Sequence, residues 1–442
     1  CLPHQRVATG SGCADCKMRW LLLFLRLTAV TTLRLAPAGG RLRFHVAPMQ
    51  CFTNTHLRYL LRRFSPTAVL WTEMEKVEDL LKSEAALERR LQGSDEQSPV
   101  VLQLGGSDPE ALRLAARRAL PYGFDEVNLN CGCPTTQANG KAGYGAELML
   151  DPELTRRCVE ALTDECAGQV PVSVKCRINA HTGLSDGQLP SDNYDTLANF
   201  VSHACEAAGA SHVVLHARSA ILSLSPLKNR QVPSLRHEWA HQLARDFPQL
   251  RITLNGGIAS EADLRTAAAA ATASGLDGLM SGRWVLRDPF ALANVERLLA
   301  NMDSSEIQDI PSPAFGLSED VARTAVAALS EYGSYASRLA FRQDCERMQL
   351  VSPLILVLEA LRERVEAAEF EGASLDRGVD EVLDALWEAI CSVAWPNTPG
   401  MSACSRPTIK KMYKMLGQMT GKKVARKAVR NRAEAVGTTV PA

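Results

Sequence analysis

Residues 100–130 read VVLQLGGSDPEALRLAARRALPYGFDEVNLN. Two short apolar runs, VVLQL and EVNLN, flank a segment from Pro109 to Leu120 that carries Ala, Leu and Arg at helical spacing. A strand-length apolar run, an amphipathic helix and a second such run are the pattern of a parallel βαβ unit. This stretch therefore predicts a parallel sheet covered by helices.

The same alternation continues in both directions along the chain. Eight apolar runs end in polar clusters, namely RFHVAP (43–48), AVLW (68–71), VVLQL (100–104), EVNLN (126–130), VPVSVK (170–175), HVVLH (212–216), RITLN (251–255) and GLMSG (278–282). Eight βα units in about 240 residues have the size of a TIM barrel. A doubly wound open sheet is the structural alternative, but no run carries a GxGxxG turn. We therefore predict an α/β fold with a (β/α)8 TIM barrel over residues 43–300.

Strand-like runs stop after the barrel. A joint containing Pro and Ser (304–313) leads into helical patterns that predict an all-helical C-terminal domain over residues 314–436, with an acidic insertion near 342–403. The segment from Arg406 to Arg432 holds ten Lys or Arg and no acidic residue. A solvated face or a nuclear signal explains most such runs, but beside a catalytic barrel this one favours contact with RNA phosphates.

Composition limits the class of protein. Hydrophobic residues make up 46% of the chain, and Lys plus Arg equal Asp plus Glu at 49 each, which is typical of a globular protein. Thirteen scattered Cys indicate reduced thiols inside the cell. The CxxC from Cys13 to Cys16 has no second pair at zinc spacing, so we predict no metal site.

The first 42 residues differ from the rest of the chain. Asp15 is the one acidic residue before position 44, and Arg26 interrupts the apolar stretch from Trp20 to Val30. Such a stretch is too short and broken to span a bilayer but is typical of a targeting leader. We predict a disordered leader over residues 1–42, no membrane association, and an intracellular protein that is either cytoplasmic or directed to a plastid or mitochondrion.

Polar residues close the predicted strands, at the end where a TIM barrel places its active site. They are Met49, Gln50, Glu73, Gln103, Asn128, Asn130, Cys133, Lys175, Arg177, His216, Arg218, Asn255 and Arg283. So many converging polar groups predict a bound ligand. Glycines in LNGGI (254–258) and MSGRW (280–284) could be simple turns, but on adjacent strands they favour a phosphate site.

Three of these residues have competing interpretations. Lys175 should meet an anion or a ring carbonyl such as a flavin offers, or else pair with Glu73, because an unpaired ammonium in a barrel is costly to desolvate. His216 is a ligand-binding residue or a core histidine, and Arg218 beside it favours the first. In NLNCGCPTTQ, position alone favours Cys133 over Cys131 for proton transfer and leaves both open.

Ten motifs together resemble the tRNA-dihydrouridine synthases, and among them the bacterial A-type branch. They are RFHVAPMQCFTNTHLRYLLR, VLWTEM, VVLQLGGSDPEAL, DEVNLNCGCP, GYGAELM, PVSVKCRI, VVLHAR, SPLKNRQVPSL, LNGGI and SGR. They occur in one order from about Phe44 to Arg283, with a weaker echo from Pro407 to Val429. The resemblance implies FMN as cofactor, NADPH as reductant, and tRNA as substrate, in which the C5–C6 bond of D-loop uridines at positions 20 and 20a is reduced.

The resemblance also implies roles for individual residues. Flavin contacts are implied for Pro48, Met49, Gln50, Gln103, Lys175, His216, Asn255, Gly256, Gly257, Gly282 and Arg283, the last five around the phosphate. Cys133 aligns with the family's proton donor, and Asn130 would help hold a uracil turned out of its stack. Contacts with tRNA are implied for Arg218, Lys228, Asn229, Arg230, Arg426 and Lys427. Leu227 departs from the family pattern, which has a basic residue there.

Two other functions stay open at this stage. A flavin-dependent barrel dehydrogenase acting on a free pyrimidine would need no basic helical domain, and a non-catalytic RNA-binding barrel would bind RNA without flavin. We expect no obligate protein partner in any of these cases.

Overall fold

The computed structural model describes residues 42–134, 143–300, 316–340, 347–371 and 376–394, with a few positions between 407 and 415. All of them belong to one compact unit, Pro37–Ala442. The predicted leader up to residue 41 lies outside the described residues, as do Arg426 and Lys427.

Eight parallel strands form one sheet in the order β1-β10-β9-β7-β5-β4-β3-β2. They are β1 (Arg43–Val46), β2 (Leu70–Lys76), β3 (Val100–Gly105), β4 (Glu126–Cys131), β5 (Val172–Arg177), β7 (His212–His216), β9 (Arg251–Asn255) and β10 (Gly278–Ser281). A parallel bridge between His45 and Val69 joins the two edges, with Val46 N–H donating to the Val69 carbonyl at 2.9 Å. The sheet is therefore closed, and the predicted TIM barrel is confirmed.

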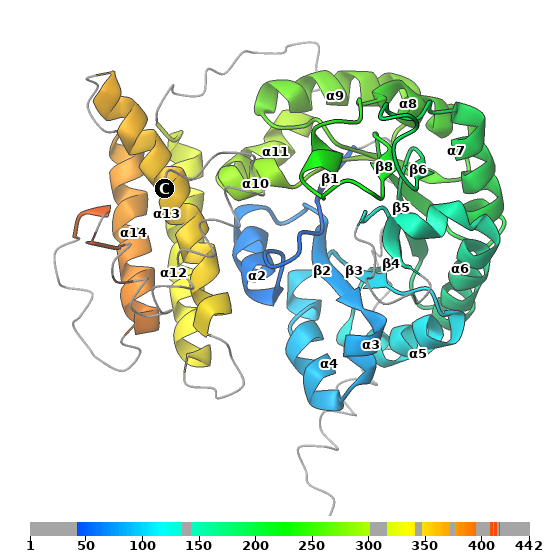
Figure 1. Ribbon diagram of the computed structural model, residues 1–442. Helices are drawn as coiled ribbons and strands as arrows, with labels where there is room; N and C mark the ends of the chain where they lie inside the picture. Colours follow the sequence, from blue (N-terminus) through cyan, green and yellow to red (C-terminus); the bar gives the residue numbers. More distant parts are fainter. Residues whose placement is uncertain are drawn as a thin grey trace, which may run out of the picture. The chain divides into compact units, whose positions relative to one another are not determined.

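Helices follow the strands and surround the barrel (Figure 1). They are α2 (Thr55–Phe64), α3 (Val77–Leu81), α4 (Glu84–Leu91), α5 (Pro109–Ala119), α6 (Pro152–Cys166), α7 (Tyr194–Phe200), α8 (His237–Asp246), α9 (Glu261–Ser274), α10 (Arg283–Arg287) and α11 (Ala291–Ala300). Helix α5, which the sequence predicts, and helix α6 both begin with Pro after an Asp whose carboxylate accepts a backbone N–H, which fixes their first turn. Within the described residues, no helix has the length and apolarity that crossing a membrane requires.

A second, two-stranded parallel sheet was not predicted. It pairs β6 (Ala180–His181) with β8 (Ala220–Ile221) and joins the segments that follow β5 and β7. Strands of two residues carry no periodic signal, which explains the omission.

Short helical segments lie between the longer elements. They are η1 (Asp95–Gln97), η2 (Leu120–Tyr122), η3 (Gly145–Leu150), η4 (Val201–Glu206) and η5 (Lys228–Arg230).

The predicted C-terminal helical region is present as α12 (Glu319–Leu339), α13 (Arg347–Phe370) and α14 (Arg377–Ala394). Helix α12 contacts α2 of the barrel through aromatic rings. The rings of Tyr59 and Tyr335 stack at 3.8 Å, and the Tyr335 hydroxyl lies 2.8 Å from Nδ1 of His56. An ion pair of 2.7 Å between Arg63 and Glu331 lies beside them.

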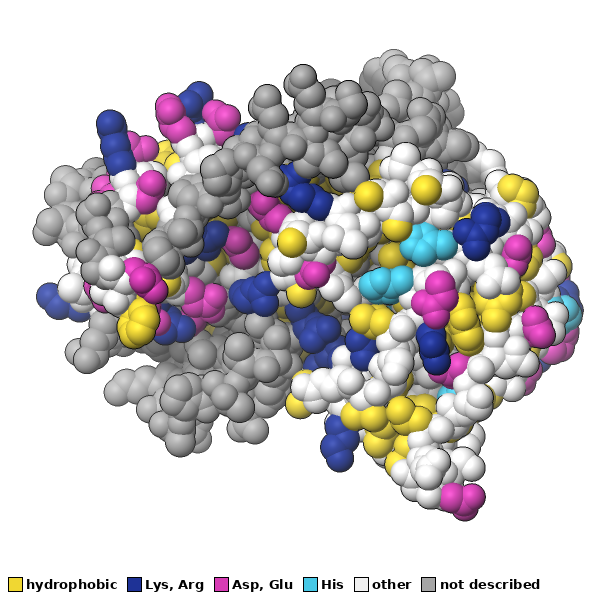
Figure 2. Space-filling model, turned by 90° about the horizontal axis from the view of Figure 1, so that it is seen from above, with side chains coloured by type: hydrophobic (Ala, Val, Ile, Leu, Met, Phe, Trp, Pro, Cys, Tyr) yellow, Lys and Arg dark blue, Asp and Glu magenta, His cyan; other side chains and the backbone are white. Residues whose placement is uncertain are grey.

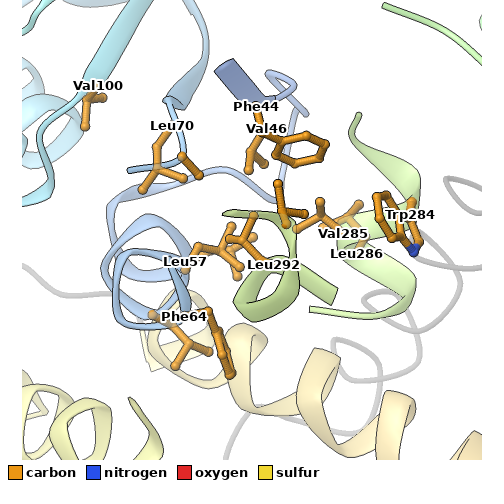
Figure 3. Close-up of a cluster of buried hydrophobic side chains, with 14 of the residues drawn as sticks. Phe44, Val46, Leu57, Phe64, Leu70, Val100, Trp284, Val285, Leu286 and Leu292 are labelled. Atoms are coloured by element: carbon orange, nitrogen blue, oxygen red, sulfur yellow. The ribbon is translucent and has the colours of Figure 1, made fainter. Parts of the chain in front are cut away.

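A hydrophobic cluster lies where the first and last βα units of the barrel meet (Figure 3). It includes Phe44, Val46, Leu57, Phe64, Leu70, Val100, Trp284, Val285, Leu286 and Leu292, all nearly or fully buried. The Phe44 ring meets the Trp284 ring edge-on with centroids 6.2 Å apart. Burying a side chain of this size contributes roughly 1.5–3 kcal/mol, so the cluster stabilises the closure of the barrel.

Charged and polar side chains occupy the N-terminal end of the strands. His212 contacts the Glu126 carboxylate at 3.0 Å and the Thr253 hydroxyl at 2.9 Å, and Arg251 donates to Glu126 at 2.8 Å. Burial raises the pKa of Glu126, but His212 and Arg251 outweigh it and hold that pKa well below its usual range. Because this end of a TIM barrel is opposite the active site, the network serves stability.

Candidate active site

The predicted site residues meet at the C-terminal ends of the strands. Strand register places Asn130 beside Lys175, and His216 beside Asn255. Gln103 lies beside Asn128 in the same way. The sequence therefore brings six polar side chains from β3, β4, β5, β7 and β9 to one mouth.

A ladder of amides fixes the loop that carries Cys133. The Asn130 side-chain oxygen accepts from the backbone N–H of Gly132 at 3.1 Å and of Cys133 at 2.9 Å. Asn130 then donates to Gln103 at 2.7 Å, Gln103 to Asn128 at 2.9 Å, and Asn128 to the Ser173 hydroxyl at 2.8 Å. Each buried amide has partners, which makes the ladder rigid.

The structure distinguishes the two thiols at the end of β4. Cys131 is fully buried, and burial raises the pKa of its thiol well above the usual value. Cys133 is partly exposed, and its carbonyl accepts from the N–H of Ala146 at 2.8 Å. The accessible thiol of the pair is thus Cys133.

Lys175 is 9% exposed and donates to the Asn255 side-chain oxygen at 3.1 Å. Asn255 in turn donates to the Met280 carbonyl at 3.0 Å. In the described part of the chain no carboxylate pairs with Lys175, and Glu73 instead accepts from the N–H of Cys51. Burial, and then Arg177, lowers the pKa of Lys175 to about 8. A buried ammonium with one neutral partner is suited to an anionic ligand.

Glycines at the ends of β9 and β10 leave room that side chains would fill. Gly256 and Gly257 have φ of +107° and +85°, which favours glycine. A Cβ at Gly256 would lie 2.9 Å from the His216 ring, and one at Gly282 would lie 2.9 Å from the Met49 sulfur. Burial lowers the pKa of His216 well below its usual value, and the positive charges of Arg177 and Lys175 lower it further, so the ring is neutral. The turn, the neutral ring and the exposed side chain of Arg283 fit a phosphate.

The loop between β1 and α2 approaches the same mouth. It contains Pro48, Met49 and Gln50, of which Gln50 is exposed. Met49 N–H donates to the Thr53 hydroxyl at 3.0 Å, and Gln50 donates to Glu73 at 3.5 Å. The side chain of Glu73 in β2 and that of Thr53 within the loop therefore hold this loop in place.

Arginines gather at the mouth without acidic partners. Burial lowers the pKa of Arg177, Arg218, Arg230 and Arg283. The charge of Arg283 lowers the pKa of Arg218 and of Arg230 further, and those two arginines lower that of Arg177. No carboxylate among the described residues pairs with any of the four. The face in Figure 2, by contrast, shows both signs of charge over much of its described surface. Unbalanced positive charge at the mouth predicts a ligand with several negative charges.

The three predicted tRNA contacts in η5, Lys228 to Arg230, divide into two groups. Lys228 is exposed and Arg230 is half-buried, so both can reach a ligand. Asn229 is fully buried, and its amide accepts from Ile221 N–H and donates to the carbonyls of Ile221 and Leu224, each at 2.8 Å. Its side chain therefore supports the loop, and its contact with tRNA stays a prediction.

The fold and the cationic side chains at its mouth define a TIM-barrel enzyme, because enzymes of this fold have their active site at that end. The family model for dihydrouridine synthases (Dus) matches residues 45–340, and this chain belongs to that family. The resemblance that the motifs indicate is thereby confirmed.

Relatives with assigned names agree with the family. The chain is 42% identical over 269 residues (60% of this chain, 74% of the relative) to the tRNA-dihydrouridine(20/20a) synthase of Xanthomonas campestris. It is 41% identical over 282 residues (63% and 77%) to the protein of that name in Pseudomonas putida, and 40% over 253 residues (57% and 70%) to that of Synechocystis. Morphinone reductase in complex with tetrahydroNAD overlaps 58% of this chain and 86% of its own, with 13% identity and a TM-score of 0.40, too weak a likeness to carry an argument.

Proposed function

We propose that this chain is an FMN-dependent tRNA-dihydrouridine synthase that uses NADPH to reduce the C5–C6 bond of uridines at D-loop positions 20 and 20a. One observation carries the proposal: the accessible thiol of Cys133 and the buried ammonium of Lys175 lie at one barrel mouth, and no described carboxylate pairs with that ammonium. Family membership supports the reaction class, and the names of the relatives support tRNA and the two positions.

The mouth fits a flavin mononucleotide. The turn at Gly256 and Gly257, with Gly282 and Arg283, would take the phosphate, because backbone there comes close without a Cβ in the way. Lys175 would face the ring edge that becomes negative on reduction, and Gln103, His216, Asn255 and Pro48 to Gln50 would line the remainder. When bound and reduced by NADPH, the flavin supplies the hydride for uracil C6.

Cys133 would supply the proton. Addition of a hydride at C6 leaves negative charge that a proton at C5 neutralises, so one hydride and one proton saturate the double bond. The Cys133 thiol donates that proton and recovers one from solvent afterwards. Asn130 contributes by holding the backbone N–H of Cys133, as well as through the predicted hold on the uracil.

Folded tRNA hides the target base, so the uridine must leave its stack to enter the barrel. Arg218, Lys228 and Arg230 surround the mouth and would neutralise phosphates near the extruded nucleotide. Arg426 and Lys427 would add a second contact from the basic segment. The unbalanced charge favours this substrate over a free pyrimidine, which carries no phosphates.

The test compares cofactor and product in one preparation. Purified protein should absorb in the flavin band and release FMN on denaturation, and tRNA lacking dihydrouridine should gain it at positions 20 and 20a when NADPH is added. A colourless protein that binds tRNA would support the non-catalytic RNA-binding barrel. A yellow protein that reduces free uracil but not tRNA would support the pyrimidine dehydrogenase.

A further inference from the structure

Arg177 is a buried cation whose hydrogen bonds all go to main-chain carbonyls. It is 4% exposed at the end of β5. Its Nε donates to the Gly132 carbonyl at 3.0 Å, and its Nη1 donates to the Ser219 carbonyl at 3.0 Å and the Asn229 carbonyl at 3.4 Å. These carbonyls belong to three loops, which follow β4, β7 and β8.

A guanidinium in this position is expensive to bury. In the described chain no carboxylate pairs with Arg177, and carbonyl dipoles offset the loss of water only in part. Burial lowers the pKa of Arg177 to about 10, so the group is charged at neutral pH. The planar guanidinium has several N–H donors in a fixed geometry and can bond separate loops at once, which the ammonium of lysine cannot do in the same way. This property explains why an arginine stands at position 177.

The bond to Gly132 acts directly on Cys133. The carbonyl of Gly132 and the N–H of Cys133 belong to the same peptide unit, which is planar. Arg177 holds the carbonyl, and Asn130 holds the N–H at 2.9 Å. Fixing both polar groups sets the plane of that peptide and hence restricts the direction in which the Cys133 side chain leaves the backbone.

We propose that Arg177 is a positioning residue for the Cys133 thiol: it fixes the Gly132–Cys133 peptide and braces it against the loop that carries Lys228 to Arg230. The role of Cys133 as proton donor rests on the proposed function, whereas the geometric role of Arg177 does not. Because Arg177 bonds both the Gly132 and the Asn229 carbonyls, a movement of the Lys228–Arg230 loop on contact with tRNA would also shift the Cys133 thiol.

Alkylation of Cys133 in the purified protein measures this geometry without RNA or turnover. Iodoacetamide is added at alkaline pH, where rates report access more than ionisation, and modification is followed by mass spectrometry of the peptide that contains Cys133. The exposed thiol of Cys51, on the β1–α2 loop, is the reference within the same sample. Arg177→Lys keeps the charge but loses the fork. We expect Cys133 to react about two- to tenfold faster relative to Cys51, the range that loss of one hydrogen bond gives.

Arg62→Lys is the matched control. Arg62 also donates only to main-chain carbonyls, those of Gln97, Ser65, Ala68 and Pro99. These carbonyls precede β2 and β3, at the end of the barrel opposite Cys133. Arg62→Lys should lower the melting temperature and leave the ratio of Cys133 to Cys51 alkylation unchanged.

Turnover supplies the second readout. In Arg177→Lys we expect kcat for tRNA reduction to fall at least tenfold, with flavin content and the KM for NADPH within twofold of the native protein. Arg177→Gln, which buries no bare ammonium, is the second variant should the first not fold. An unchanged alkylation ratio in whichever variant folds would overturn the proposal. A changed ratio in a protein without flavin or product would keep the geometry and refute the proposed function.

Discussion

The chemistry proposed for the mouth depends on Cys133, whose backbone is fixed on both sides. Cys133→Ala removes the only group at this position that can give a proton, and Cys133→Ser leaves a much weaker acid. Loss of a general acid lowers rates by about 10²- to 10⁴-fold, so we expect kcat to fall in that range in both variants. Flavin absorbance and tRNA affinity measured by filter binding should not change. Dihydrouridine formation at the native rate in Cys133→Ala would remove the thiol from the mechanism.

If Lys175 contacts FMN as proposed, FMN binding should depend on pH. Its pKa near 8 in the free site means that part of the population is neutral above that pH. A bound anion favours the ammonium and raises this pKa, so binding between about pH 8 and 9 must take up protons. Calorimetry of FMN binding in buffers of different ionisation enthalpy measures the uptake. We expect up to one proton at pH 8.5, much less at pH 7, and none at either pH in Lys175→Met. Equal uptake in native protein and variant would contradict the assignment.

Sequence position alone predicted which residues reach the mouth, because parallel strands end at the same edge. It could not predict which hydrogen bonds a side-chain amide makes inside the protein. The sequence predicts substrate contacts for Asn130 and Asn229, and the structure adds hydrogen bonds within the protein: the Asn130 amide bonds Gln103 and the Cys133 loop, and the Asn229 amide bonds its own loop. The choice between ligand and loop depends on neighbours that are distant in sequence, such as Gln103. The hydrogen bonds that join Arg177 to three loops could not be predicted for the same reason.

Strands β4, β7 and β9 are joined below the mouth by the buried carboxylate of Glu126. The depressed pKa of Glu126 has a definite sign: its contribution to stability is present above the unfolded pKa of about 4.5 and is lost as pH falls toward the folded value. Glu126→Gln removes the charge that His212 and Arg251 contact, and breaking such a buried pair costs about 3–5 kcal/mol. Urea titrations should show this loss at pH 7 and a smaller difference between variant and native protein at pH 3, where the unfolded carboxyl is protonated but the folded one is not. A constant difference at both values would contradict the ionic origin.

Periodicity was sufficient to predict the main strands and helix α5, since each contributes several residues to one face. It failed for β6 and β8, which are held by the loops around them rather than by their own pattern. Asn229 is one of those supports, because its amide bonds both backbone groups of Ile221 in β8. Elements that depend on a single distant side chain leave no repeat for sequence analysis to detect.

The contact between the helical region and the barrel also could not be predicted from the sequence. Tyr335 and His56 are 279 positions apart, and neither carries a motif that indicates the other. The contact has a consequence for the site, because α2 begins directly after the β1–α2 loop that carries Met49 and Gln50. The Tyr59–Tyr335 stack thus connects the loop expected to meet flavin with the region expected to meet tRNA.

Tyr335→Ala tests this connection across the chain. It removes the stacked ring and the hydroxyl near His56, and a half-buried aromatic pair of this kind contributes about 1–3 kcal/mol. We expect the helical region to unfold at a lower temperature than the barrel in calorimetry, and KM for tRNA to rise severalfold. Flavin content and the alkylation ratio of Cys133 to Cys51 should stay at native values, because the mouth itself is untouched. Tyr335→Phe, which keeps the ring and loses the hydroxyl, should show at most a small part of each effect. A single unfolding transition with native KM in Tyr335→Ala would mean that the stack does not couple the helical region to the barrel.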